Sequence, residues 1–226
     1  MGDTIVLAHA PLVGPSSWSF VAEILVDEGA EVLVPDLHQL ARGQLARDFA
    51  DALATVIHGH ESVVLVGHSG AGPLLPLAVE RARSASVRYV FVDAAVPPPG
   101  APLPASQAFR AQLEALVEPD GLLPPWHTWW GPDGMTWLVP DEQRRAFVAA
   151  DICRLPLAYF DAEIVAPTGW QDRPGGFVLL SETYRSFANT AVEFGWPVVE
   201  VMGTHLELVN DPDAVAAAIF STISAA

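Results

Sequence analysis

Short apolar runs alternate with longer amphipathic stretches through the N-terminal part of the chain. The runs are rich in β-branched and aliphatic residues, which is typical of buried strands. After the first run, apolar side chains recur at helical spacing, from Trp18 and Val21 to Leu25. The alternation predicts right-handed crossovers and a mostly parallel sheet. The predicted strands in this part cover residues 4–8, 31–36, 62–66 and 87–93.

Start and stop signals bound the predicted helices. Pro15 and Ser16 open the first helix and Gly29 ends it, while Asn210-Asp211-Pro212 introduces the last one. After residue 170 the alternation of strands and helices resumes, so that six core strands are predicted in one α/β fold. The two later strands are expected at 176–181 and 197–201, and the helices at 15–28, 42–58 (from about Arg42), 73–83, 182–194 and 214–226.

Residues 94–170 interrupt this alternation with many prolines. Proline lacks a backbone N–H and prevents a long helix or a central strand. We therefore predict two short helices here, at 105–117 and 141–150, separated by turns. Most of the tryptophans in this part are expected to form a small local core, and at least one to form the apolar wall of a pocket. They are four of the chain's seven tryptophans, Trp126, Trp129, Trp130 and Trp137.

Composition and charge narrow the classes of function. With 226 residues, of which 51% are hydrophobic, the chain can bury a large core in one domain. A formal charge of −16 argues against nucleic acid or an anionic membrane surface as a partner, because both would repel it. Cys153 is the single cysteine, so an intrachain disulfide is excluded. Without a signal-peptide pattern or an apolar run long enough to span a membrane, we predict a soluble cytoplasmic protein.

The stretch from Ser62 to Arg83 carries the strongest chemical signal. Five residues of apolar strand lead into Gly67-His68-Ser69-Gly70-Ala71-Gly72, and a helical pattern begins at Pro73. A serine on a sharp, glycine-flanked turn between strand and helix is typical of a nucleophile elbow, although alanine holds the position of the usual last glycine. A helix-capping serine is the second interpretation. A dinucleotide loop ranks third, because the glycines are spaced as G-x-x-G-x-G rather than G-x-G-x-x-G.

A serine hydroxyl needs a base, and His205 is the candidate. It follows the last predicted strand in Gly203-Thr204-His205. A lone histidine is more often a polar loop residue, but the end of a strand at the same sheet edge as the elbow favours a base. A carboxylate must then orient the imidazole. Asp93 ends the strand that follows the elbow strand, and Glu182 follows the penultimate strand.

The elbow at Ser69 and the Gly-Thr-His ending of the last strand resemble the α/β-hydrolase family. The resemblance covers nearly the whole chain and implies a minimal member that lacks the first two strands of larger relatives. It implies a core of residues 1–96 and 171–226, a helical cap at 97–170, and no cofactor. The family's order of nucleophile, acid and histidine is also present. The commoner acid position would be Glu182, but the Phe91-Val92-Asp93 ending resembles a branch whose acid follows this strand, and we prefer Asp93.

The loop after the first strand resembles the family's oxyanion loop, with one departure. Gly70 should donate one backbone N–H, and the residue two after His9 should donate the other. That residue is Pro11, which has no N–H, so Leu12 becomes the candidate. Loss of one donor would cost about 3 kcal/mol of transition-state stabilisation. His9 and His68 are further candidates for substrate contact, although His9 is equally well explained as structural.

Together these residues predict a serine hydrolase for an ester, thioester or lactone with an apolar portion. Ser69 would attack, His205 would act as base and then acid, and Asp93 would orient it. The remaining histidines do not cluster with carboxylates or Cys153 at ligand spacing, so no metal site is predicted. Two alternatives stay open. Pro11 favours a lyase or cyclase that uses His205 and Asp93 for proton transfer, and the lack of the commoner acid favours a small-molecule binder with a vestigial triad. The sequence makes no prediction of oligomeric state.

Overall fold

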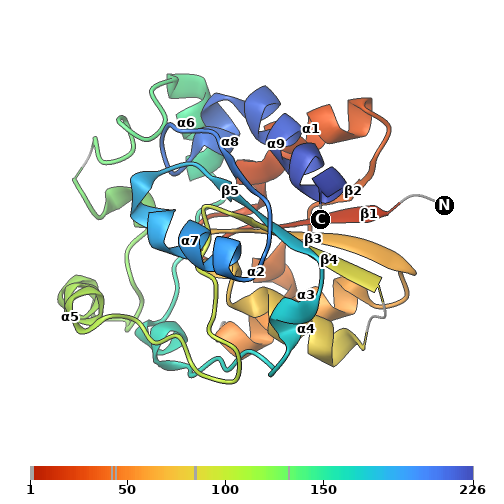
Figure 1. Ribbon diagram of the computed structural model, residues 1–226. Helices are drawn as coiled ribbons and strands as arrows, with labels where there is room; N and C mark the ends of the chain where they lie inside the picture. Colours follow the sequence, from red (N-terminus) through yellow and green to blue (C-terminus); the bar gives the residue numbers. More distant parts are fainter. Residues whose placement is uncertain (1–2, 42, 44, 84–85, 132, 226) are drawn as a thin grey trace.

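Six parallel strands form one sheet in the order β2-β1-β3-β4-β5-β6 (Figure 1). The structure is a computed structural model that describes residues 3–41, 43, 45–83, 86–131 and 133–225. All five strand pairings are parallel. This confirms the predicted fold class. The strands are β1 (Thr4–Ala8), β2 (Glu31–Leu33), β3 (Ser62–His68), β4 (Ser86–Val92), β5 (Gly175–Leu179) and β6 (Val198–Glu200).

The helices follow the predicted order, with mostly shorter bounds and two short additions, while the last helix begins two residues earlier than predicted, at Pro212. The second long helix begins at Ala46, and the predicted start at Arg42 lies outside the described residues, as does Ala226 at the predicted end of the last helix. Two four-residue helices, α2 and α8, were not predicted. The bounds are α1 (Ser19–Asp27), α2 (Leu37–Leu40), α3 (Ala46–Ile57), α4 (Leu74–Ala82), α5 (Gln107–Leu116), α6 (Glu142–Ala149), α7 (Arg185–Glu193), α8 (Glu207–Asn210) and α9 (Pro212–Ala225).

The sheet lies between two layers of helices, because alternate residues of each central strand face opposite sides. Leu65 and Phe91 pack with buried side chains of α3 and α4, whereas Val64 and Val90 pack with those of α1 and α9. Figure 1 shows these two helix pairs below and above the sheet. Strands that are buried on both faces read as continuous apolar runs, which explains the sequence pattern.

The register of the sheet places the chemistry at one edge. His68 at the end of β3 is paired with Val92 at the end of β4, so Ser69 and Asp93 directly follow neighbouring strands. The residues after β5 and β6 leave the sheet at the same edge, because all strands run in parallel. Side chains from segments far apart in sequence therefore meet at the carboxyl ends of the strands.

Residues 97–170 connect β4 to β5 and contain α5 and α6. Pro102 pairs with Val165 and Leu122 with Pro156 in isolated antiparallel bridges that tie the segment to itself. Buried side chains from α6 and the turn before it, including Leu138 and Val148, join the same apolar cluster as Trp18 of the core. Apolar packing thus fixes this part of the segment to the core.

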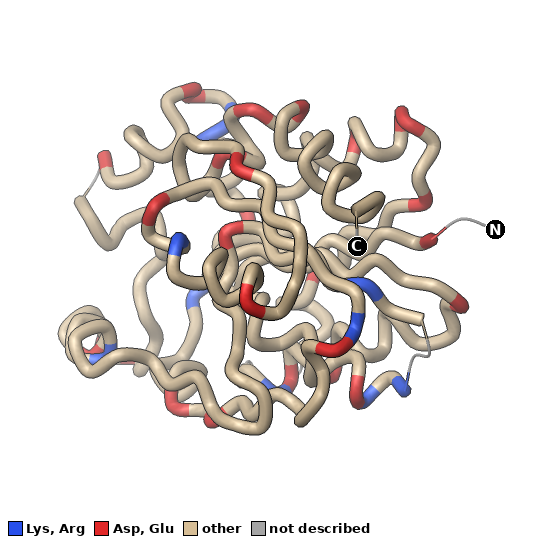
Figure 2. Tube along the Cα trace, in the orientation of Figure 1, with Lys and Arg blue, Asp and Glu red and all other residues tan. Residues whose placement is uncertain are grey.

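Acidic residues are spread along the whole chain and outnumber basic ones (Figure 2). Several arginines are paired with them, as in the contacts of Arg110 with Glu114 and Asp161 and of Arg154 with Asp120. Exposed pairs of this kind contribute little stability, about 0–1 kcal/mol each. Among the described residues, no helix combines the length and the apolar character needed to cross a membrane.

Candidate active site

Ser69 stands on a strained turn that the surrounding glycines permit. Its φ of 55° lies in the left-handed region, which non-glycine residues rarely adopt. A Cβ at Gly67 would come within 2.9 Å of the Leu75 side chain, and one at Gly72 would overlap the carbonyl oxygen of Ala95. Both positions therefore need glycine. The turn presents the Ser69 side chain to a cavity at this end of the sheet.

His205, in the loop between β6 and α8, joins Ser69 to Asp93. Its Nε2 lies 2.9 Å from Ser69 Oγ, and its Nδ1 lies 2.7 Å from Asp93 Oδ2. An ionised carboxylate only accepts hydrogen bonds, so Nδ1 carries the proton and donates it to Asp93. Nε2 is then free to accept the hydroxyl proton of Ser69. The three side chains form a continuous hydrogen-bonded chain, in the order expected for a nucleophile, a base and an orienting acid.

Asp93 is fully buried, yet its charge is well compensated. Its Oδ1 accepts the backbone N–H groups of Leu180 and Ser181, both at 3.0 Å, and Oδ2 accepts the Ser181 hydroxyl at 2.7 Å. Burial alone would raise the pKa of the Asp93 carboxyl, but hydrogen bonds from His205, Ser181 and Leu180 together lower it below its ordinary value. Asp93 also has a left-handed φ of 42°. The site therefore holds an ionised carboxylate against His205.

Glu182, the alternative acid, lies on the surface. Its carboxylate pairs with Arg185 at 2.7 Å, and Arg185 also contacts Glu200. The hydrogen bond from Arg185 lowers the pKa of the Glu182 carboxyl. The structure thus brings Asp93 to His205 and turns Glu182 toward an arginine.

Tyr184 is part of the site and was not singled out from the sequence. It ends a short 3₁₀ turn (Glu182–Tyr184) after β5. Its hydroxyl lies 3.1 Å from Ser69 Oγ. Its ring is parallel to that of His205, at an angle of 1° and a centroid distance of 4.9 Å. The one available signal was its place three residues after Ser181, at the end of a predicted core strand.

His68, the residue before Ser69, supports His205. Its Nε2–H donates to the carbonyl oxygen of His205 at 3.0 Å, and the two rings lie 4.5 Å apart between centroids. Burial lowers the pKa of His68 to about 3, so the ring is neutral at ordinary pH. It lines the cavity, as expected for a substrate contact. Its hydrogen bond adds a role in holding the His205 backbone.

The two predicted oxyanion donors lie on one wall of the cavity. Gly70 and Leu12 both line it, together with Pro11. The Pro11 ring is 3.4 Å from the position that a Cβ would take on Gly70, so the loop after β1 packs directly against the elbow. Within the loop, the Val13 N–H donates to the Ala10 carbonyl at 3.0 Å, which closes a tight turn around Pro11 and Leu12.

The loop after β1 is also fastened to residues 97–170. Asp151, just after α6, accepts the Ser16 N–H at 2.8 Å and the Ser16 hydroxyl at 2.6 Å. A Cβ at Gly14 would overlap the Asp151 carboxylate, so glycine is required there. One carboxylate from the segment between β4 and β5 thus fixes the chain that carries the candidate oxyanion donor.

The structure does not support the predicted substrate contact of His9. Its side chain is completely buried and is not among the residues that line the cavity. Its Nδ1–H donates to the Ala10 carbonyl at 2.9 Å, and its Nε2 accepts the Leu37 N–H at 3.0 Å. Burial lowers the pKa of His9 to about 4, which keeps it neutral. A neutral ring with one donor and one acceptor suits this position. His9 therefore holds the backbone behind the loop.

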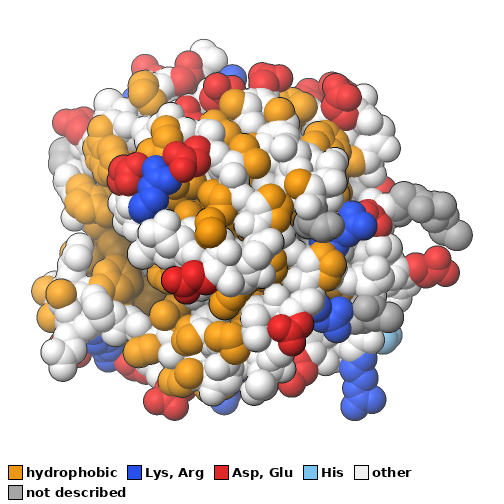
Figure 3. Space-filling model, viewed as in Figure 1, with side chains coloured by type: hydrophobic (Ala, Val, Ile, Leu, Met, Phe, Trp, Pro, Cys, Tyr) orange, Lys and Arg blue, Asp and Glu red, His pale blue; other side chains and the backbone are white. Residues whose placement is uncertain are grey.

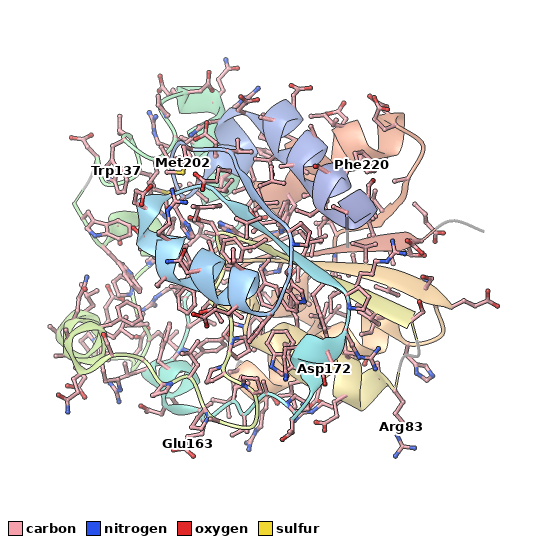
Figure 4. All side chains as sticks on the ribbon, viewed as in Figure 1. Arg83, Trp137, Glu163, Asp172, Met202 and Phe220 are labelled. Carbon is pink, nitrogen blue, oxygen red and sulfur yellow. The ribbon has the colours of Figure 1, made fainter. Side chains whose placement is uncertain are left out.

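The cavity beside Ser69 has a volume of about 460 Å³ and mostly apolar walls. All four tryptophans from residues 97–170 contribute to it, and Tyr159 and Phe160 add further rings. Its lining contains no lysine, arginine, aspartate or glutamate among the described residues. Figure 3 shows apolar side chains gathered around a hollow at the left of the view, and Figure 4 places Trp137 at that edge of the molecule. No group of three potential metal-ligating side chains occurs in the described part of the chain.

Comparison with known proteins agrees with this architecture. A family model described as "Alpha/beta hydrolase family" matches residues 5–218, and the chain belongs to this family. No curated protein sequence matches it significantly.

Solved structures with the same fold cover almost the whole chain. An extracellular α/β-hydrolase from a Paenibacillus species is 15% identical, with a TM-score of 0.76, covering 98% of this chain and 99% of its own. A methylesterase from Arabidopsis is 13% identical, with a TM-score of 0.75 and complete coverage of both chains. A variant of tomato methylketone synthase I in complex with β-ketoheptanoate is 16% identical, with a TM-score of 0.74, covering 100% of this chain and 99% of its own. At these identities the similarity establishes the fold.

Proposed function

We propose that this protein is a serine hydrolase that cleaves an ester, thioester or lactone with an apolar portion. The observation that carries the proposal is the hydrogen-bonded chain from Asp93 through His205 to Ser69, with distances of 2.7 and 2.9 Å. The backbone strain at Ser69 supports it, because a structural serine has no need of a left-handed conformation. Membership of the α/β-hydrolase family raises the expectation of such a site.

In the proposed reaction, Ser69 Oγ attacks the substrate's carbonyl carbon while its proton passes to His205 Nε2. The ionised Asp93 stabilises the imidazolium that forms. Backbone N–H groups of Gly70 and Leu12 are the proposed donors to the developing oxyanion. The imidazolium then protonates the leaving group, and a water molecule deprotonated by His205 releases the acyl group from Ser69. No cofactor takes part in this scheme.

The substrate portion next to the carbonyl is proposed to be apolar and uncharged. A cavity of about 460 Å³ is within the usual range for a small molecule, and its aromatic walls provide no charged partner. We further propose that residues 97–170 act as a cap over a core of residues 1–96 and 171–226, since this segment supplies all four tryptophans of the wall. Esterases are also among the proteins of similar fold, including polyneuridine aldehyde esterase.

A second function is favoured by one observation. Pro11 occupies the position from which an oxyanion donor is expected, and it has no N–H to give. If Leu12 does not replace that donor, His205 and Asp93 would serve proton transfer in a lyase or cyclase reaction. Tomato methylketone synthase I has a similar fold.

Labelling with a fluorophosphonate probe tests the proposal, because only an activated serine reacts quickly. We expect rapid labelling of the wild-type protein, no labelling of a Ser69→Ala variant, and turnover of p-nitrophenyl acyl esters by the wild type alone. Wild-type protein that resists the probe but converts another substrate would favour the lyase or cyclase. Protein that resists the probe and binds ligands without converting them would favour a vestigial triad.

A further inference from the structure

The hydroxyl of Tyr184 contacts the nucleophile itself, and the mechanism above does not use it. It lies 3.1 Å from Ser69 Oγ, while the ring stacks on His205. The two other tyrosines have different surroundings. Tyr89 packs against Phe91 and tryptophans of the core, and Tyr159 packs against Phe49 and Phe160. Tyr184 is thus the tyrosine with both a polar and a stacking contact to the triad.

The direction of this hydrogen bond follows from the proton count at Ser69. The single hydroxyl proton of Ser69 goes to His205 Nε2, because Asp93 keeps the other imidazole nitrogen protonated. Ser69 Oγ can then only accept from Tyr184. Burial raises the pKa of the Tyr184 hydroxyl, so it retains its proton in neutral solution and is able to donate.

These contacts determine how Ser69 Oγ is oriented. An sp³ oxygen has four directions, and one is its bond to Cβ. His205 takes the hydrogen and Tyr184 takes one lone pair, which leaves a single lone pair for attack. Because Ser69 lines the cavity, this lone pair is available to a bound carbonyl carbon. Without Tyr184, two lone pairs would compete and the hydroxyl would rotate more freely.

We infer that Tyr184 is a catalytic residue whose hydroxyl orients Ser69 Oγ and stabilises the negative charge that develops on it, an inference that rests on the proposed hydrolase function. During acylation the Oγ–carbonyl bond forms as the serine proton moves to His205, and the bond to the leaving group then breaks as that group takes the proton. During deacylation a water molecule gives a proton to His205 as its oxygen bonds to the acyl carbon, the bond from that carbon to Oγ then breaks, and Oγ recovers the proton from His205. Tyr184 keeps its own proton throughout.

Both steps place partial negative charge on Oγ, and this is where the donor acts. A hydrogen bond to a charged acceptor is roughly twice as strong as one between neutral groups. The Tyr184 hydroxyl therefore binds the transition state more tightly than the resting serine, which is the condition for catalysis. Its contribution adds to that of the candidate backbone donors, Gly70 and Leu12. The usual second donor is missing, because Pro11 holds its position and has no N–H.

Two substitutions separate the hydroxyl from the ring. Tyr184→Phe keeps the stacking on His205 and removes only the hydroxyl, whereas Tyr184→Leu removes both. Tyr89→Phe is the matched control, because it deletes a buried phenolic hydroxyl in the core, outside the cavity lining. For each protein we would measure the second-order rate of fluorophosphonate labelling, kcat and KM for p-nitrophenyl acetate, the pH–rate profile and the thermal unfolding midpoint.

For Tyr184→Phe we expect labelling and kcat to fall about 10- to 100-fold. KM, the pH–rate profile and the unfolding midpoint should stay near wild type, and Tyr89→Phe should keep the full rate. Tyr184→Leu should lower kcat further than Tyr184→Phe does, because His205 also loses the ring that stacks on it. A Tyr184→Phe labelling rate within about twofold of wild type, or a change confined to KM, would overturn the inference. In that case rapid labelling of the wild type and its loss in Ser69→Ala would still support the hydrolase, so the two failures are distinguishable.

Discussion

The sheet edge and the segment of residues 97–170 build one cavity by different means. At the sheet edge, Ser69 and Asp93 adopt strained backbone conformations, and hydrogen bonds join both side chains to His205. In the segment, the cavity wall consists of indole rings such as Trp126 and Trp130, whose centroids lie 5.2 Å apart. Hydrogen bonds fix atoms within tenths of an ångström, whereas apolar contacts between rings are less directional and tolerate ligands of different shapes. Under the proposed function, the sheet edge would determine the reaction and residues 97–170 would determine the choice of substrate.

The largest expected effect comes from removing the nucleophile. Ser69→Ala should lower kcat by about 10³-fold or more, because among the described residues no other hydroxyl is hydrogen-bonded to His205 Nε2. Folding should be retained, since the Ser69 hydroxyl bonds only to His205 and Tyr184. Steady-state kinetics with p-nitrophenyl esters and circular dichroism are the measurements. Undiminished turnover would mean that Ser69 is not the nucleophile, and it would contradict the division of roles between the sheet edge and residues 97–170.

The second effect tests which carboxylate serves the triad. Asp93→Asn should lower kcat about 10²- to 10⁴-fold, because the amide cannot stabilise the imidazolium and favours the wrong tautomer. Glu182→Gln is the matched control and should stay within about twofold of wild type, since Glu182 pairs with Arg185 on the surface. The ratio of kcat/KM values for the two variants decides the question. A crippled Glu182→Gln enzyme with an active Asp93→Asn enzyme would reverse the assignment.

A smaller and more selective effect is expected from the aromatic wall. Trp130→Ala should lower kcat/KM about tenfold for long-chain or aromatic esters, because a ring that is half-exposed at the cavity loses its contact with the substrate. Acetyl esters, which do not reach the wall, should be converted at nearly the wild-type rate. A series of p-nitrophenyl esters of increasing acyl length measures this.

Trp170→Ala is the control for the aromatic wall. Trp170 is buried among Tyr89, Phe91 and Trp196 and does not line the cavity. Its removal should lower the free energy of unfolding by about 3–5 kcal/mol without changing the order of preference among esters. If Trp130→Ala reduced all esters equally and also lowered stability, the segment would be packing material rather than a substrate wall.

The smallest effect is a pH dependence of the free energy of unfolding, caused by two buried histidines at the carboxyl ends of core strands. His9 and His68 have pKa values lowered by burial to about 4 and about 3. Below pH 6.5 the unfolded chain therefore binds protons that the folded chain does not, so stability falls as the pH falls from 6.5 toward these values. Each histidine should cost about 2 kcal/mol by pH 5. Urea unfolding at pH 7 and pH 5 measures this loss, and a His9→Gln/His68→Gln double variant that loses as much as wild type would contradict it.

Sequence patterns located the sheet-edge residues because each follows a recognisable strand. Ser69 stands in a glycine-rich turn, Asp93 ends an apolar run, and parallel strands bring such ends together. The six strands were predicted because each is a short apolar run between stretches with a helical pattern. The four-residue helices α2 and α8 were missed, because one helical turn is too short to show a periodic pattern.

The remaining site residues could not be found in this way. Tyr184 and Ser181 contact Ser69 and Asp93 over more than eighty residues of sequence, and their place at or just after a predicted strand does not reveal these contacts. His9 was proposed as a substrate contact beside the loop that resembles an oxyanion loop, but this position does not reveal on which side the ring will lie. The role of Asp151 depends on a partner 135 residues away. Such pairings are decided by tertiary packing.

The hydrogen bonds between Asp151 and Ser16 limit how this protein could be re-engineered. Residues 97–170 look exchangeable, because they enter the chain between two core strands. Here a transplant that replaced residues 97–170 would also delete the carboxylate that accepts both the N–H and the hydroxyl of Ser16. Gly14 would face an empty space, and the loop bearing Pro11 and Leu12 would lose its anchor. A successful chimera would need to transfer the loop after β1 and residues 97–170 together, from the same parent protein.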